Sequence, residues 1–182
     1  LEEALKLGCD VIGGMPYNEY TDDDSIKHID LVFKLAKKYD VDIDMHVDET
    51  DDFNARTLQY LAAKTIKEKY SGRVTAGHTC ALASYNDYYA AKVIEIIRTA
   101  KMNMITNPAT NLMLEGRLDK QPVRRGITRV KELIAAGINV CYGQDCIKDT
   151  FYPTFGQADM LEVGLIAAHA IQFSTPEEIE QL

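Results

Sequence analysis

Several patterns that assign a chain to a common class are missing here. The four cysteines, Cys9, Cys80, Cys141 and Cys146, lie far apart without a C-x-x-C pair, which excludes zinc-ribbon and thioredoxin-like sites. No apolar run approaches the ~18 residues of a membrane span, and no basic N-terminal segment precedes an apolar core. We therefore expect a cytoplasmic protein with reduced thiols and no membrane partner.

Positive charge and phosphate-binding loops are also scarce. The chain has 20 Lys and Arg against 28 Asp and Glu, a net charge of −8 and a pI near 5.0. Such a surface repels nucleic acid and anionic lipid unless a strong basic patch is present, and the cluster at residues 124–131 is too small to provide one. Neither a G-x-G-x-x-G turn nor a G-K-S/T loop occurs, so the sequence does not predict a dinucleotide or nucleoside triphosphate site.

What the sequence does contain is a regular alternation of strand-like and helix-like segments. Predicted strands fall at residues 9–15, 41–47, 73–77, 102–106 and 138–142, and predicted helices at 1–7, 26–39, 52–70, 85–101, 127–136 and 156–173. This pattern predicts an α/β protein with a parallel sheet covered on both faces, in a single domain over residues 1–182. A complete (β/α)8 TIM barrel takes ~250 residues, so we expect a fragment of about five β/α units, with an open doubly wound sheet as the alternative.

Three short motifs stand where predicted strands end. They are Met45-His46-Val47-Asp48-Glu49, Gly77-His78-Thr79 and Gly143-Gln144-Asp145. Parallel α/β folds gather catalytic side chains at the carboxyl ends of their strands. A single histidine on a strand is commonly a hydrogen-bonded core residue, but two of the four histidines occur in these motifs. We interpret the three motifs as a metal-hydrolase site and His28 and His169 as structural.

The spacing of these residues suggests how they meet. Because strand side chains alternate, we expect His46 and Asp48 to share a face, with Glu49 turning toward it as the strand ends. His78 would lie beside His46, one strand spacing of ~4.8 Å away. Asp145 would be costly to bury without a partner, whereas a bound metal would favour its charge. Two imidazoles and a carboxylate fit one divalent metal.

These motifs resemble the amidohydrolase superfamily, and in particular the bacterial cytosine deaminases. The resemblance covers nearly the whole chain, and its most specific part is the run Arg124-Arg125-Gly126-Ile127-Thr128-Arg129-Val130-Lys131-Glu132. The other matching segments are residues 44–49, 73–79, 107–111, 116–117 and 137–145.

The resemblance implies a (β/α)8 metal-dependent hydrolase acting on a small nucleobase-like substrate, and it suggests a homo-oligomer. His46 and Asp145 would bind one zinc or iron ion. His78 and Asp145 would orient and deprotonate the attacking water. Glu49 would protonate the ring nitrogen and then carry a proton to the leaving ammonia, so that cytosine would yield uracil.

Two departures from the family pattern qualify this expectation. The His-x-His pair that supplies two further metal ligands and the glutamine that reads the pyrimidine edge are absent, as are the first barrel strands and a small β-domain. We therefore expect an isolated fragment that neither holds metal tightly nor turns over. Cys146 stands where cytosine deaminases have a second aspartate, at the carbon edge of the pyrimidine, so the substrate could be a 5-substituted cytosine, creatinine or another cyclic amidine or amide.

Other functions remain open at this stage. A related amidohydrolase acting on triazine, creatinine or N-alkylated rings would use the same residues, and a truncated, non-catalytic remnant would keep the fold without the chemistry. The unrelated zinc nucleobase deaminases are excluded, because neither His-x-Glu nor Pro-Cys-x-x-Cys occurs.

Overall fold

The computed structural model describes residues 1–150, 152 and 156–181. Within these residues the sheet has five strands, all parallel and joined in chain order. They are β1 (Val11–Ile12), β2 (Asp42–Val47), β3 (Val74–His78), β4 (Asn103–Thr106) and β5 (Val140–Tyr142). Helical segments separate successive strands, so the predicted β/α alternation is confirmed.

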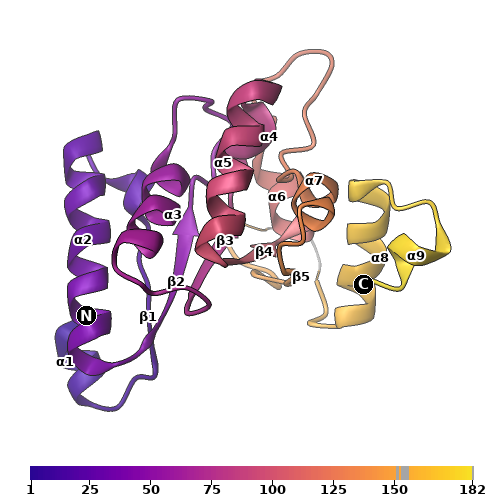
Figure 1. Cartoon of the computed structure of the whole chain (residues 1–182). Helices are drawn as coiled ribbons and strands as arrows, with labels where there is room; N and C mark the ends of the chain where they lie inside the picture. Colours follow the sequence, from indigo (N-terminus) through magenta and orange to yellow (C-terminus); the bar gives the residue numbers. More distant parts are fainter. Residues whose placement is uncertain (151, 153–155, 182) are drawn as a thin grey trace.

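The helices lie outside the sheet in the order in which the chain visits them. Figure 1 shows α2 (Asp22–Tyr39), α3 (Thr57–Lys67) and α5 (Asp87–Ala100) side by side, with α7 (Val130–Ala135) and α8 (Met160–Ile171) continuing the row. The shorter helices are α1 (Glu2–Lys6), the 3₁₀ turn η1 (Pro16–Asn18), α4 (Ala81–Ser84), α6 (Pro108–Leu114) and α9 (Pro176–Ile179). None of the helices that the structure describes is long and apolar enough to cross a membrane.

The alternation of β2 shows why this sheet has two different faces. Ile43, Met45 and Val47 are buried against the helices, whereas Asp42, Asp44 and His46 lie on the other face and are exposed. The apolar stripes of the helices complete the core with the large, fully buried side chains Ile29, Phe33, Leu58, Leu61 and Ile97. Burial of one face therefore sets the register of β2 and turns His46 away from the core.

Several predicted elements are shorter or interrupted. The strand predicted at residues 9–15 is reduced to Val11–Ile12, although the His46 N–H still donates to the Gly14 carbonyl (2.9 Å) before Pro16 begins η1. The helix predicted from residue 52 begins at Thr57. No helix was predicted between residues 106 and 127, but the segment after β4 forms α6, with Pro108 in its first turn.

Candidate functional site

Three potential metal donors meet at the carboxyl end of the sheet. His46 lies on β2, His78 ends β3 and Asp145 follows β5, and their ligand atoms lie within 4.8 Å of one another. The two imidazole rings are adjacent, with centroids 4.5 Å apart and planes inclined by 32°. Parallel pairing of β2 with β3 produces this contact, since Val47 stands opposite His78. Two imidazoles and a carboxylate suit zinc or ferrous iron, so the donor set fits such an ion.

The backbone adopts left-handed conformations where these strands end. The φ angles are 47° at Asp48, 67° at His78, 51° at Thr79 and 62° at Asp145. This region is unfavourable for side chains with a Cβ, above all for a β-branched residue such as Thr79. Thr79 is held there because its N–H donates to the Val47 carbonyl (2.9 Å) and its hydroxyl donates to Thr128 Oγ1 (2.8 Å). Such strain persists only where the surroundings impose it, and it is typical of functional sites.

Glu49 and His78 form a buried acid–base pair beside the donor cluster. Glu49 Oε1 lies 2.9 Å from His78 Nδ1, and their side chains are 10% and 1% exposed. Burial opposes charge on both groups, but their mutual hydrogen bond and opposite charges outweigh it. As a result the pKa of Glu49 is lowered and the pKa of His78 is raised. The pair therefore favours a carboxylate beside an imidazolium.

Further hydrogen bonds hold Glu49 in place. The Asn111 amide donates to Oε1 (2.9 Å), and the Tyr17 hydroxyl donates to Oε2 (3.4 Å). Both carboxylate oxygens thus have partners from other segments, α6 and η1. Neither Asn111 nor Tyr17 was assigned a role from the sequence.

Helix α6 brings two asparagines to His78. Asn107, at its N-cap, places its amide nitrogen 3.1 Å from His78 Nε2, and the amide nitrogen of Asn111 lies 3.2 Å from Nδ1. A Cβ on Gly143 would come within 2.7 Å of Asn107 Oδ1, so glycine is required for this approach. The Asn107-Pro108 pair was a signal in the sequence, because proline is common in the first turn of a helix.

Asp48 does not share a face with His46, contrary to the prediction. Its side chain is fully buried, where Oδ1 accepts hydrogen bonds from the N–H and hydroxyl of Thr57 and Oδ2 accepts one from the Leu58 N–H (2.9 Å). The strand ends at Val47, and the left-handed turn at Asp48 breaks the alternation on which the prediction relied. Asp48 therefore satisfies the open N–H groups at the start of α3.

Cys146 lies directly after Asp145 and is partly buried. Burial, a hydrogen bond to Asp149 and the nearby charge of Asp145 raise the pKa of the thiol to about 12, so the thiol is neutral at physiological pH. The backbone N–H of Cys146 donates to Thr110 Oγ1 at 3.4 Å, which ties this loop to α6.

An open cleft of about 740 Å³ adjoins Glu49. Its apolar wall includes Met15, Phe53 and Leu118, and its polar lining includes Tyr17. The predicted structural histidines lie outside this region. His28 contacts Glu19 at 2.7 Å, and His169 is in the last turn of α8.

Comparisons with known proteins identify the family of this chain. Residues 2–180 match the amidohydrolase family. A pterin deaminase from Rhizobium rhizogenes is 34% identical over 81% of this chain and 34% of its own length. An N-isopropylammelide isopropyl amidohydrolase from Pseudomonas sp. is 30% identical over 98% of this chain and 41% of its own length. The chain thus spans well under half the length of these curated relatives.

A solved structure has the same fold as this chain. The 5-methylcytosine deaminase from Klebsiella pneumoniae, determined with 5-fluorocytosine, superposes with a TM-score of 0.94 at 37% identity, over 97% of this chain and 43% of that one. The match favours the barrel over the open-sheet alternative and accounts for about five β/α units. The chain belongs to the amidohydrolase family and has the fold of a cytosine deaminase-like barrel segment.

Proposed function

We propose that the complete protein catalyses metal-dependent hydrolytic deamination of a cytosine, with a 5-substituted cytosine as the preferred substrate. The observation that carries this proposal is the Glu49–His78 pair beside the His46 and Asp145 donor atoms. A proton-transferring carboxylate next to a metal donor set is the arrangement that hydrolysis of a ring amidine needs.

The residues of this chain divide the work as follows. His46 and Asp145 would hold the ion, which when bound lowers the pKa of a water toward neutrality. His78 orients the attacking water, and Asp145 accepts one of its two protons. Glu49, which is ionised in its pair with His78, takes up the other proton and delivers it to the ring nitrogen as the water attacks the amino-bearing carbon. Glu49 then carries the proton held by Asp145 to the departing ammonia. Asn111 and Tyr17 hold the carboxylate of Glu49 for both transfers.

Cys146 supports the choice of a 5-substituted ring. A neutral thiol is smaller and less polar than the aspartate of cytosine deaminases, so it removes a charge that would repel an apolar substituent. The likeness to a 5-methylcytosine deaminase supports the same choice.

A second candidate is a larger ring. The cleft beside Glu49 and the 34% identity to a pterin deaminase both favour it. A bicyclic or N-alkylated substrate would place its additional atoms against Phe53 and Leu118.

Ammonia release by the complete protein, loaded with zinc or iron, tests these alternatives. We would compare 5-methylcytosine, cytosine, creatinine, a pterin and N-isopropylammelide, the last also by release of isopropylamine. We expect the highest kcat/KM for 5-methylcytosine, and Cys146→Asp should shift the preference toward cytosine. Higher kcat/KM for the pterin or the ammelide would establish the second candidate, and an unchanged ranking in Cys146→Asp would remove the role of the thiol.

A further inference from the structure

Asp51 and Glu115 form a carboxyl pair between the two segments that deliver Glu49 and Asn111. Asp51 lies two residues after Glu49, in the loop between β2 and α3. Glu115 is the C-cap of α6 and its N–H donates to the Asn111 carbonyl at 2.9 Å. The Asp51 and Glu115 carboxyl groups are close enough to share a hydrogen bond when one of them is protonated.

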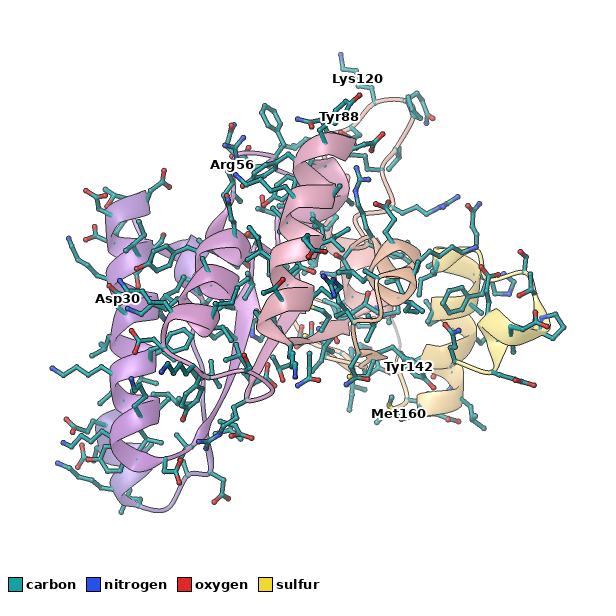
Figure 2. All side chains as sticks on the ribbon, viewed as in Figure 1. Asp30, Arg56, Tyr88, Lys120, Tyr142 and Met160 are labelled. Carbon is teal, nitrogen blue, oxygen red and sulfur yellow. The ribbon has the colours of Figure 1, made fainter. Side chains whose placement is uncertain are left out.

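Backbone contacts bring the same two segments together. The Gly116 N–H donates to Asp51 Oδ2 at 2.6 Å, and Arg124 Nη1 donates to the Asp51 carbonyl at 2.9 Å. A Cβ on Gly126 would lie 1.9 Å from the Cβ of Glu115, so the returning chain presses directly on that side chain. Figure 2 shows Lys120 projecting outward from the loop between Gly116 and Gly126.

The surroundings of Glu115 favour its protonated form. Glu115 is only 9% exposed, and the acidic groups near it are Asp51, Glu49, Tyr17 and Cys80. The cations that face it are Arg124 and, when protonated, His78. Burial and the charge of Asp51 raise the pKa of Glu115 to about 8. At neutral pH Glu115 therefore donates its O–H to the Asp51 carboxylate.

We propose that Asp51 and Glu115 are positioning residues, which share one proton and thereby fasten the Glu49 loop to the end of α6 that follows Asn111. Loss of the proton leaves two carboxylates in contact, and their repulsion separates the two segments. The hydrogen bond from Asn111 to Glu49 then loses its support, so the pair acts as an alkaline limit on the site. The kinetic part of this inference rests on the proposed deaminase function.

Infrared spectroscopy of the complete protein tests the shared proton without any substrate. We expect the carbonyl stretch of a protonated carboxylic acid at pH 7, its loss on titration through about pH 8, and its absence in Glu115→Gln. The matched control is Glu95→Gln, which removes an exposed glutamate paired with Arg98 on α5 and should leave the band unchanged. A titrating band that persists in Glu115→Gln would overturn the assignment to this pair, and absence of any such band at pH 7 would overturn the shared proton.

The pH profile of kcat/KM then tests the positioning role. In the natural protein we expect an alkaline limb, in which kcat/KM falls by roughly tenfold per pH unit. Glu115→Gln, whose amide still donates to Asp51, should keep the activity at pH 7 and lose this limb. Glu115→Ala should have a lower kcat/KM than the natural protein throughout the pH range. An identical limb in the natural protein and in Glu115→Gln would overturn the positioning role.

The two readouts separate this inference from the proposed function. An infrared band that behaves as expected, in a protein that releases no ammonia from any substrate, would support the pair and count against the deaminase. Ammonia release by a protein that lacks the infrared band would support the deaminase and count against the shared proton of the pair.

Discussion

Glu49 is held from three directions, by His78, Asn111 and Tyr17. These contacts come from β3, α6 and η1, so the position of one carboxylate depends on three separate segments. Burial alone would raise its pKa, but the contact with His78, together with the charge of His46 and the hydrogen bond from Asn111, lowers it. At the scale of the residue, the site is an acid–base pair that the surrounding structure has oriented in advance.

Replacement of this carboxylate isolates its role in proton transfer. Glu49→Gln keeps the size and the hydrogen bond to Asn111 but cannot exchange protons, so we expect kcat to fall by ~10²–10⁴-fold. Steady-state ammonia release measures the effect, and Glu95→Gln is the control for a surface glutamate. Metal content should stay unchanged, and a kcat close to that of the natural protein would exclude Glu49 as the acid–base group.

The stability of the protein should depend on pH through Glu115. The folded state raises the pKa of this carboxyl from 4.5 to about 8, so in that interval the folded protein binds more protons than the unfolded chain. The stabilising contribution is complete below pH 4.5 and is lost as pH rises toward 8, by at most ~1.4 kcal/mol per pH unit for one proton. Urea unfolding of the complete protein and of Glu115→Gln at pH 5 and pH 8 measures it. The variant should gain stability relative to the natural protein at pH 8, and a difference independent of pH would contradict the prediction.

At the scale of the element, the ends of strands and the starts of helices form one unit. Asp48 ends β2 with a left-handed residue and at once accepts hydrogen bonds at the start of α3. The same short segment carries Glu49 into the site. Helix α6 behaves similarly, since Asn107 and Asn111 both reach His78 from its two turns. Along these segments, residues that stabilise the fold therefore lie next to residues that form the candidate site.

Removal of the Asp48 cap should destabilise the fold. Asp48→Ala leaves the N–H groups of Thr57 and Leu58 and the Thr57 hydroxyl without an acceptor in a buried place, with an expected loss of ~2–3 kcal/mol in the free energy of unfolding. Asp159→Ala is the matched control, because Asp159 caps α8 at an exposed position by accepting the Leu161 N–H. It should cost ~1 kcal/mol or less. Equal losses of unfolding free energy in the two variants would show that the burial of Asp48 adds nothing to the stabilisation by its cap.

At the scale of the whole molecule, the sheet has one face covered by helices and one that carries polar groups. Asp44 and His46 on β2 lie on the second face, together with the exposed Cys141 on β5. In a closed barrel this face lines the interior, where side chains from alternate strands pack in layers. In this chain His46 and Asp145 are exposed.

Metal affinity should therefore differ between this chain and the complete protein. The 182 residues contribute His46, His78 and Asp145, of which the first and last are exposed, and they contain no His-x-His pair. Equilibrium dialysis against zinc should find one tightly held ion in the complete protein and only weak binding by the 182-residue chain, which His46→Ala should weaken further. Circular dichroism checks that the shorter chain is folded. Tight stoichiometric binding by the chain alone would contradict this prediction.

Much of this arrangement was predictable from local patterns. Apolar periodicity predicted the β/α alternation, and the order and parallel pairing of the strands followed from it. Motif position predicted that His46, His78 and Asp145 would be neighbours, because parallel strands end at a common edge. Patterns of this kind are readable because burial of one face imposes a period of two on a strand and of about 3.6 on a helix.

Other features depend on contacts between distant segments. Periodicity along β2 placed Asp48 beside His46, but the left-handed turn and the open N–H groups of α3 direct it into the core. The partners of Glu49 come from residues 17, 78 and 111, and the Asp51–Glu115 proton exists only because two loops bury both carboxyls together. The sequence by itself determined the fold class and the chemical groups at the strand ends. The tertiary structure decided their orientation and protonation, since both depend on burial and on neighbours far apart in the chain.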